Sequence, residues 1–501
     1  MENLVFKPVV IPEVEWWSLL PVGTVIVTGI IALVVEMFRP QRQNGPIVAV
    51  SLIGLLAAFA LLVPQLNMAP MESFADMVVR DRPGVIFQML LILGAFITIL
   101  FSENYLRRKL IPFGEFYPLA LWSLSGGMLM VTTNNLLMLF LGLEVLSIAL
   151  YCMAGMSRQE AKSEESALKY FLLGAFSSAF LLYGIAFVFG ASGTVHLDGI
   201  AAVLLDGNTT AGNMTLFGIG LILVGLCFKA AFVPFHQWTP DVYQGAPTNV
   251  TAFMAAVSKI AAIGALYRVL TAAAGAIDFW LPILFWVAIL TMTVGNLIAL
   301  AQKDVKRILG YSSIAHAGYL LVALLAHLRN PTEIGIGTTA FYLLAYSLAT
   351  VGAFAVVGLV AQEGKESTRL QDLNGLWKKA PLAAGAMVVF MMSLIGVPPT
   401  GGFFGKAFIF SDALSADLTW LAIALAINSA ISLYYYLGIL KAAFVDEEQE
   451  RPVFGQMGAA LKTTVVACAV GIFLVMIFAG PVLKASTEPA LEEEPLALNA
   501  E

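Results

Sequence analysis

Five ionisable residues stand inside or against long apolar stretches of this chain: Glu144, Lys169, Lys229, Lys259 and Lys406. A charged side chain at the centre of a bilayer costs about 2.5–3.5 kcal/mol on insertion scales. Such residues therefore tend to face a protein interior, where they pair with one another or carry protons or ions. The proton affinity of a buried lysine depends on its distance from a carboxylate. Glu144 and Lys229 are our candidates for such a switchable pair.

A relay could continue from this pair. Water chains would pass a released proton from Lys229 to Lys259, then to His316 and Lys406. No redox centre is needed for such a path, only coupling from a neighbour. The three cysteines lie far apart in apolar context and show no metal or Fe–S spacing, so we interpret Cys152, Cys227 and Cys468 as small core residues.

Composition places the chain in a membrane. It has 501 residues, of which 59% are hydrophobic and 12% charged, whereas soluble domains carry about 25% charged residues. A soluble globule is therefore excluded. The net charge of −6 argues against a nucleic-acid surface. The lipid bilayer is the expected environment.

Hydropathy predicts an all-α polytopic membrane protein, because a helical span needs about 20 mostly apolar residues. Alternating β-barrel patterning is absent from the sequence. We predict about fourteen transmembrane helices, at 16–38, 46–64, 84–104, 115–133, 135–155, 166–190, 214–243, 248–272, 278–300, 305–327, 335–362, 383–411, 418–443 and 462–482.

Two of the predicted spans are broken. Three prolines interrupt the helical pattern in residues 226–247, and a Pro-Pro pair with nearby glycines interrupts it in residues 395–406. Proline removes a backbone donor and clashes with the preceding turn. Non-helical backbone survives at membrane depth only inside protein or beside a water-filled cavity. A lysine accompanies each break, Lys229 at the first and Lys406 at the second.

The order of these features indicates a duplicated unit. Glu144 and Lys229 lie in the fifth and seventh predicted spans, and His316 and Lys406 lie in the tenth and twelfth. An offset of five spans inverts the second copy relative to the first, as in many secondary transporters. We therefore predict two inverted five-helix repeats, each containing a discontinuous helix. The predicted divisions are an N-terminal three-helix segment at 1–114, repeats at 115–272 and 278–443, and a C-terminal helix with an acidic tail at 444–501.

Basic loop residues predict the orientation. They gather in alternate loops, which hold for example Arg107, Lys303 and Lys378. The positive-inside rule then places both termini on the outer side of the membrane. We interpret Lys306 and Arg307 as topological charges of the same kind.

Three motifs resemble the antiporter-like membrane subunits of respiratory complex I. They are VPFHQWTPDVYQGAPTNVTAF (233–253), QKDVKRILGYSSIAHAGYL (302–320) and GVPPTGGFFGK (396–406). The resemblance covers nearly the whole chain. VYQGAPT and the lysine in the twelfth span are similar to one subunit type of that family. The other two types carry a glutamate in the twelfth span or a long lateral helix after the fourteenth.

The resemblance implies a function and a place. The chain would translocate protons, driven by electron transfer from NADH to quinone in other subunits of the complex. It would bind no cofactor itself, and NADH, FMN, Fe–S clusters and quinone would belong to its membrane-arm and peripheral partners. The location implied is the bacterial inner membrane. Glu144, Lys229, Lys259 and Lys406 match the family's translocation residues, and Lys169 matches a lysine near the start of the sixth span.

Each of these charged residues also has a plainer interpretation. Glu144 and Lys229 could form a static ion pair that holds helices together. Lys259 and Lys406 could extend to an interface, and Lys169 lies close enough to the predicted boundary for this to be equally plausible.

The histidines also have alternatives. His316 is a possible relay residue, or a core histidine bonded to Ser312 or Ser313. His236, another possible relay residue, and Asp241 fit better as organisers of the turn at the first break.

Three classes of function remain open at this point. The first is a proton-pumping subunit of complex I, and the second is a subunit of a multi-subunit cation/proton antiporter. The third is a membrane scaffold whose charges only hold helices together. Neighbouring genes for Fe–S and flavin subunits would favour the first over the second.

Overall fold

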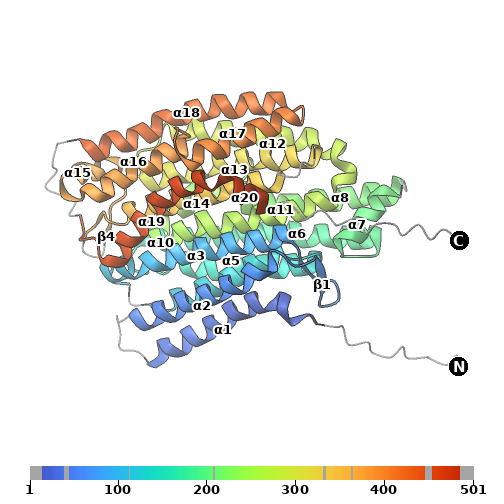
Figure 1. The fold of residues 1–501 in the computed structure, drawn as a ribbon, viewed down its shortest axis with the longest axis horizontal. Coiled ribbons are helices and arrows are strands. Elements are labelled where there is room, and N and C mark those ends of the chain that lie inside the picture. The colour runs from blue at the N-terminus through green and yellow to red at the C-terminus, as the bar shows by residue number, and fades with distance from the viewer. Residues whose placement is uncertain are drawn as a thin grey trace, which may run out of the picture.

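The structure is a computed structural model that describes residues 14–38, 44–111, 113–206, 209–330, 335–362, 365–445 and 454–485. Its long helices run side by side along one direction (Figure 1). The helix α15 and the strand β4 lie at one end of this bundle, and α7 and β1 lie at the other (Figure 1). The predicted acidic tail lies mostly outside the described residues.

The N-terminal segment contributes three helices. Its elements are α1 (Trp16–Phe38), α2 (Gly45–Gln65), the antiparallel strands β1 (Met71–Ser73) and β2 (Val78–Arg80), and α3 (Arg82–Arg108). The strands pair Met71 with Arg80 and Ser73 with Val78. Asp81 caps α3 by accepting a hydrogen bond from the Gly84 backbone N–H.

The next helices include the first predicted break. They are α4 (Phe116–Val131), α5 (Leu136–Ala154), α6 (Ala161–Ser192), α7 (Leu197–Leu205), α8 (Thr209–Ala230) and α9 (Trp238–Gly245). A continuous span follows, composed of α10 (Thr248–Phe253), the π-helix η1 (Met254–Ser258) and α11 (Lys259–Ala272). The predicted span at 214–243 is thus divided between α8 and α9.

The remaining helices include the second break. They are η2 (Ala274–Ala276), α12 (Ile277–Ala299), α13 (Val305–Arg329), α14 (Gly335–Val357), η3 (Leu370–Leu373), α15 (Leu376–Lys379), α16 (Pro381–Ile395), α17 (Gly401–Ser415), α18 (Thr419–Phe444), α19 (Ala459–Ile477) and α20 (Ala479–Ala485). The strands β3 (Ala361–Gln362) and β4 (Lys365–Glu366) pair between α14 and η3. The predicted span at 383–411 is divided between α16 and α17.

The predicted fold class is confirmed. Among the described residues, twelve helices are long and apolar enough to cross a membrane, and Phe116–Val131 and Pro381–Ile395 are shorter apolar helices. The total of fourteen spans, the inverted repeats and the division boundaries remain predictions.

Burial separates central helices from peripheral ones. The most apolar window of α13 is 100% buried within the chain, and the windows of α14 and of residues 248–272 are each 94% buried. The corresponding window of α6 is only 33% buried. Polar side chains on α11, α13 and α14 must therefore find partners inside the protein.

One face of α5 points away from the rest of the chain. Leu141, Val145 and Ile148 are exposed on it, at the spacing of one helical face. Cys152 continues this face and is exposed, so its interpretation as a core residue is wrong. Cys227 and Cys468 are buried as predicted.

Candidate proton path

The first break places Lys229 at the end of α8. The helix stops at Ala230, and Ala231 takes a left-handed conformation with φ of 66°. This conformation is unusual for a residue with a side chain. The indole N–H of Trp238 in α9 donates to the Phe228 carbonyl at 2.9 Å. One carbonyl freed by the break is therefore satisfied by a side chain from the other half of the broken span.

Lys229 is buried between α5 and α6. Its Nζ donates to Ser147 Oγ at 2.8 Å and lies 3.0 Å from the Tyr170 hydroxyl. Glu144 is half-buried and accepts a short hydrogen bond from Ser178 on α6. The acid and Lys229 form no ion pair within 4.0 Å, although both lie in the described part of the chain. The pair is thus held apart by separate hydroxyl partners.

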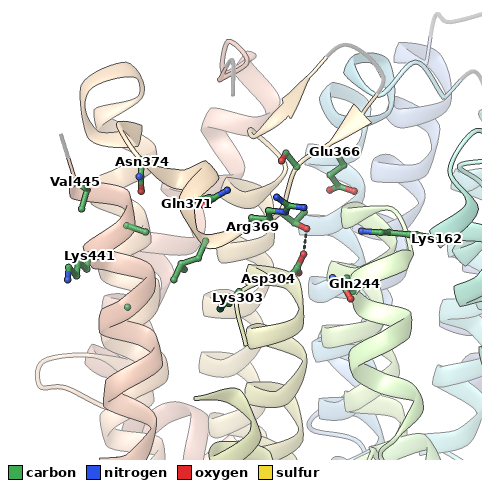
Figure 2. A pocket seen from close by; sticks show the side chains of 15 residues that line it. Lys162, Gln244, Lys303, Asp304, Glu366, Arg369, Gln371, Asn374, Lys441 and Val445 are labelled. Atoms are coloured by element: carbon green, nitrogen blue, oxygen red, sulfur yellow. Dashed lines mark hydrogen bonds between the residues drawn. The ribbon is translucent and has the colours of Figure 1, made fainter. Parts of the chain in front are cut away.

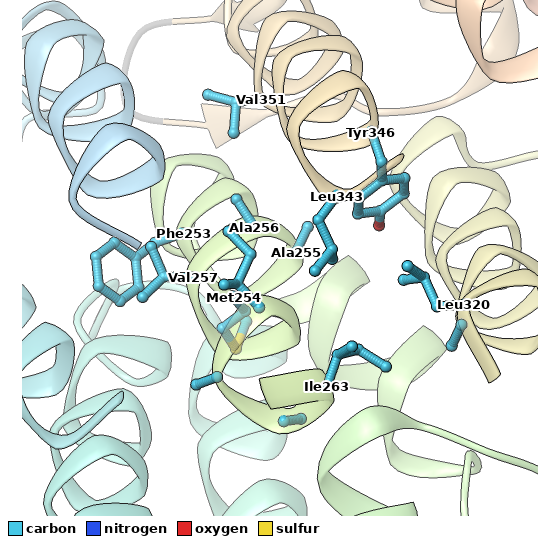
Figure 3. Close-up of a cluster of buried hydrophobic side chains, with 14 of the residues drawn as sticks. Phe253, Met254, Ala255, Ala256, Val257, Ile263, Leu320, Leu343, Tyr346 and Val351 are labelled. Carbon is cyan, nitrogen blue, oxygen red and sulfur yellow. The ribbon is translucent and has the colours of Figure 1, made fainter. Parts of the chain in front are cut away.

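The π-helix η1 ends immediately before Lys259. A π-turn inserts an extra residue into a helix and is frequent at functional sites. Figure 3 shows Met254 and Val257 of this turn among apolar side chains that include Leu343. No feature that we used in the sequence predicts this turn.

Lys259 extends from this turn to α13. Its Nζ donates to the Ser313 carbonyl at 2.5 Å and lies 5.8 Å from the ring centroid of Tyr346. The Tyr346 hydroxyl donates to Ser313 Oγ at 2.8 Å. Lys259 is only 4% exposed, so extension to an interface is excluded for this residue.

His316 stands at the centre of an aromatic cluster. The Tyr342 hydroxyl lies 2.6 Å from its Nδ1, and the Tyr436 hydroxyl lies 3.1 Å from its Nε2. The rings of Tyr346 and Tyr319 have centroids 5.0 and 5.4 Å from that of the imidazole. Both ring nitrogens therefore have hydroxyl partners, which can donate or accept as the tautomer requires.

Lys406 ends this series. Its Nζ donates to the carbonyls of Leu394 and Ile395, each at 2.9 Å, and lies 4.9 Å from the Tyr319 ring centroid. These carbonyls belong to the last turn of α16, where the break leaves them without helical partners. Gly396 follows with φ of 89°, and a Cβ there would lie 3.0 Å from the Lys406 side chain. The second break therefore leaves two backbone carbonyls free to accept from Lys406, and the glycine at the break leaves space for the lysine side chain.

The structure brings three of the seven predicted site residues into one buried series. Lys259, His316 and Lys406 are joined through Tyr346 and Tyr319, with successive separations of 5.8, 5.0, 5.4 and 4.9 Å. These separations are measured to ring centroids, so they show packing contacts and not hydrogen bonds between successive members. A proton that moved along the series would also need hydrogen-bonding groups or water beside it.

Buried polar atoms without a protein partner mark places for such water. Within the described residues, side-chain atoms of this kind include Ser258 Oγ, both amide atoms of Asn249, Ser347 Oγ and Thr350 Oγ1. Ser258 directly precedes Lys259, and Ser347 follows Tyr346 in α14. Buried polar groups are usually satisfied, by ordered water where protein groups are absent. The sites therefore favour a hydrated interior along these helices.

Lys169 is separate from this buried series. Its side chain is 42% exposed and pairs with Glu165 at 2.7 Å and with Asp241 at 2.9 Å. Asp241 also accepts from Arg307 at 2.6 Å. Lys169 therefore lies at the surface of the described protein and ties α6 to the first broken span.

His236 lies in the turn of the first break. It is half-buried, and its Nδ1 has no hydrogen-bond partner among the described residues. The predicted hydrogen bonds of His316 to Ser312 or Ser313 are replaced by the bonds to tyrosines. Ser312 instead bonds to Tyr436, and Ser313 to Tyr346.

Sequence reasoning missed a second charged cluster near β4. Glu366 is paired with Lys306 at 3.3 Å and with Lys109 at 4.0 Å, and its side chain is only 7% exposed. Its carboxylate also accepts from Thr248 at the start of α10 and from Tyr105 at 3.2 Å. Burial raises the pKa of Glu366, but the two lysines and the hydrogen bonds outweigh burial and hold it below the usual value of 4.5.

The topological interpretation of Lys306 is therefore incomplete. The residue is fully buried, and its Nζ also donates to the Ala246 carbonyl at 2.5 Å. Its position inside the 302–320 motif was the available signal. Nothing in the sequence indicates that the carboxylate of Glu366, sixty residues later, pairs with Lys306.

No metal site is present in the part of the chain that the structure describes, because no three His, Cys, Asp or Glu residues gather there. The described side chains offer tyrosine hydroxyls, lysine amines, one imidazole and serine hydroxyls along the path. These groups can accept, hold and release protons.

Comparison with known proteins gives a consistent result. Residues 133–432 match a sequence model of the family described as NADH:quinone oxidoreductase/Mrp antiporter, TM. A Trichlorobacter lovleyi protein named NADH-quinone oxidoreductase subunit N is 41% identical over 93% of this chain and 95% of its own length. A Mycobacterium tuberculosis protein of the same name is 39% identical over 93% of this chain and 83% of its own length.

Solved structures show the same likeness. A chain of respiratory complex I from Thermus thermophilus is 37% identical, with a TM-score of 0.78 over 93% of this chain and all of its own length. A chain of the Mrp complex from Dietzia sp. DQ12-45-1b has a TM-score of 0.81 over 94% of this chain and 96% of its own length. Its identity is only 22%, so that likeness shows the fold alone.

Proposed function

The chain belongs to the NADH:quinone oxidoreductase/Mrp antiporter membrane family, and from this premise we propose that it is the proton-translocating subunit N of a complex that transfers electrons from NADH to quinone. The observation that carries the proposal is the buried series Lys259, His316 and Lys406, linked by aromatic side chains. A scaffold would gain nothing from three titratable groups held in this way, since each costs desolvation.

The proposed path begins at Glu144 and Lys229. Lys229 is held by two hydroxyl groups, and Ser147 among them stands one turn after Glu144 on the same helix. A small movement of α5 against α8 would change the distance between the amine and the carboxylate. That distance governs how tightly the amine holds its proton. Release from Lys229 would load Lys259 through water beside Ser258.

The second half of the path would carry the proton onward. Lys259 and Lys406 lie on opposite sides of His316 in the linked series. The imidazole can accept a proton at one nitrogen and donate from the other, with a tyrosine hydroxyl beside each. His316 is the proposed middle member, Lys406 the terminal one, and Lys169 and His236 lie outside this series.

Partners would cover the acidic end of the path. Glu144 lies beside the outward face of α5 formed by Leu141, Val145 and Ile148. An ionisable residue so close to an uncovered apolar face fits contact with another membrane subunit better than contact with lipid. The peripheral partners would hold FMN, the Fe–S clusters and the NADH and quinone sites. The proposed location is the bacterial inner membrane, with both termini on the outer side.

Names of the relatives favour this function over a cation/proton antiporter. The relatives that are 36–44% identical are named subunit N of NADH-quinone oxidoreductase, whereas the Mrp structure resembles the chain in fold only. Co-purification of NADH:quinone reductase activity with the chain would support the proposal. Co-purification with antiporter subunits and without that activity would contradict it.

Lys229 offers the sharpest test of the mechanism. Lys229→Arg keeps a positive charge but cannot release a proton, because guanidinium stays charged in proteins. We expect NADH-driven proton uptake into vesicles to fall about tenfold or more, since a positioned proton-transfer group typically contributes about 10²–10⁴-fold. The boundary variant Lys169→Arg should keep most of the uptake. Full pumping by Lys229→Arg in the assembled complex would show that only a fixed charge is needed there.

A further inference from the structure

A basic cavity opens at the end of the bundle that carries β4 and α15. Its volume is about 1030 Å³, and Lys162, Lys303, Arg369 and Lys441 line it together with two acids (Figure 2). These four basic residues come from α6, the turn before α13, the turn before η3 and the last turn of α18. None of them forms an ion pair with another described residue.

The two acids of the cavity are already occupied. Asp304 accepts a hydrogen bond from Thr368 and caps α13 by accepting from the Arg307 backbone N–H at 3.1 Å. Glu366 is paired with Lys306. The neutral donors leave the charge of Asp304 in place, but four basic residues against two acids still give the cavity a net positive charge.

An apolar groove continues from this cavity along α18. Its volume is about 600 Å³, and it shares Leu370, Gly438 and Lys441 with the basic cavity. Leu433 and Leu437 line it one helical turn apart, and Tyr434 lies beside them with 73% of its surface exposed. The groove thus leads from the last turn of α18 toward the middle of a membrane-spanning helix.

We propose that the cavity and the groove together bind one anionic phospholipid, with its phosphate beside Lys303 and Arg369, Lys441 at the wall that the two volumes share, and an acyl chain against Leu433 and Leu437. Basic pockets between membrane helices are suited to anionic head groups. A free phosphate ion would use the cavity alone and would leave the continuous apolar groove unexplained. The lipid therefore accounts for both volumes and for their shared wall at Gly438 and Lys441.

The place of the site agrees with this occupant. It lies at the end of the bundle where α3 ends at Arg107 and Arg108, and Arg108 donates there to the Gly358 carbonyl shortly before β3. By the positive-inside rule this end faces the cytoplasm, where the leaflet surface is negative. Lys441 in the last turn of α18 can reach the head-group level while its stem covers the apolar groove.

The test uses the complete complex in nanodiscs. Photoactivatable phosphatidylglycerol and phosphatidylcholine with the reactive group on the acyl chain are crosslinked, and the labelled peptides are identified by mass spectrometry. We expect phosphatidylglycerol to label α18 around Leu433 and Leu437 more strongly than phosphatidylcholine. Lys303→Gln with Lys441→Gln should reduce this preference by about fivefold for each lysine. The matched control is Lys378→Gln with Lys379→Gln, at the same end of the bundle but outside the cavity.

Additional variants and a competition experiment distinguish a bound phospholipid from a free phosphate ion, from ordinary surrounding lipid and from a protein partner. Gly438→Trp, which fills the shared wall, should reduce labelling by both lipids, whereas excess inorganic phosphate should not displace phosphatidylglycerol. Equal labelling by the two lipids in the unmodified complex would overturn the proposal, because it would describe ordinary surrounding lipid. Displacement by inorganic phosphate would make the site an anion site only. A photoreactive residue at position 434 that crosslinks to another subunit instead of lipid would show a protein occupant and also overturn it.

Discussion

Lys229 donates to the hydroxyl of Ser147 at 2.8 Å and makes no ion pair with Glu144, which stands one turn earlier on the same helix. A static ion pair would place the amine and the carboxylate in contact. The carboxylate is instead bonded to Ser178 of α6. This arrangement leaves a contact between Lys229 and Glu144 available to another state of the protein, as a switch requires.

Ser147→Ala tests this relationship directly. The variant removes one of the two hydroxyl acceptors of Lys229, and a hydrogen bond to a charged group contributes about 1.5–3 kcal/mol. We expect NADH-driven proton uptake to fall by about tenfold or more as the amine loses its position. The matched control is Ser51→Ala in α2, because within the described part of the chain the Ser51 hydroxyl bonds only to a carbonyl of its own helix. Uptake by Ser147→Ala equal to that of the control would remove Ser147 from the path.

The second break makes a steric prediction. A Cβ on Gly402 would lie 1.8 Å from the Ser393 carbonyl, whereas a Cβ on Gly385 meets nothing within 4 Å. Gly402→Ala should therefore push α17 away from α16, displace Lys406 and lower the stability of the complex by about 1–3 kcal/mol. Thermal unfolding of the purified complex measures this change. Gly385→Ala, in α16, should be nearly neutral, and equal midpoints for the two variants would refute the close approach.

His316 can be tested against a second histidine on the same helix. His316→Gln keeps a hydrogen-bonding side chain but removes the imidazole that can accept and donate protons. We expect the rate of proton uptake to fall by about 10²-fold, the lower value for a positioned acid–base group. His327→Gln, in the last turn of α13, is the control. If both variants pump like the unmodified complex, the imidazole is not part of the path.

Hydropathy and proline placement predicted most of the fold. Each predicted span overlaps a helix or a pair of helices, because apolar runs of this length have few alternatives in a bilayer. The two breaks were also predictable, since proline cannot donate within a helix. The π-turn before Lys259 was not predictable, because residues 254–258 contain no proline or glycine that would mark it.

The site was only partly visible in the sequence. A lysine in the middle of a membrane span has a high free-energy cost and is therefore conspicuous in a sequence. Lys229, Lys259 and Lys406 were predicted as site residues for this reason. Tyr346 and Tyr319 were missed because aromatic residues are ordinary in apolar helices. Their role as links depends on which helices become neighbours, and the sequence alone does not specify that.

The sequence did not predict a role for Glu366, because it lies in a polar loop, where acidic side chains are usually solvated. Its burial beside Lys109 and Lys306 makes it a stabilising group with a distinct pH dependence. Glu366→Gln leaves the buried Lys306 without its counter-charge, whereas Lys109 keeps its ion pair with Glu160. We therefore expect a loss of about 3–5 kcal/mol of stability near pH 7, measured by unfolding of the purified complex.

The sign of the pH effect follows from the lowered pKa of this carboxyl group. Burial alone would raise the pKa of the Glu366 carboxyl group. Lys306 and Lys109 lower it by more than burial raises it, so the pKa lies below 4.5. Its stabilising contribution is complete above about pH 4.5 and is lost as the pH falls through the lowered value. The difference in stability between the unmodified complex and Glu366→Gln should therefore shrink on acidification below about pH 4.5. Glu165→Gln removes an exposed pair with Lys169 and should change stability by only about 0–1 kcal/mol. A difference for Glu366→Gln that stayed constant through this acid range would show that the pKa of the carboxyl group is not lowered in the folded protein.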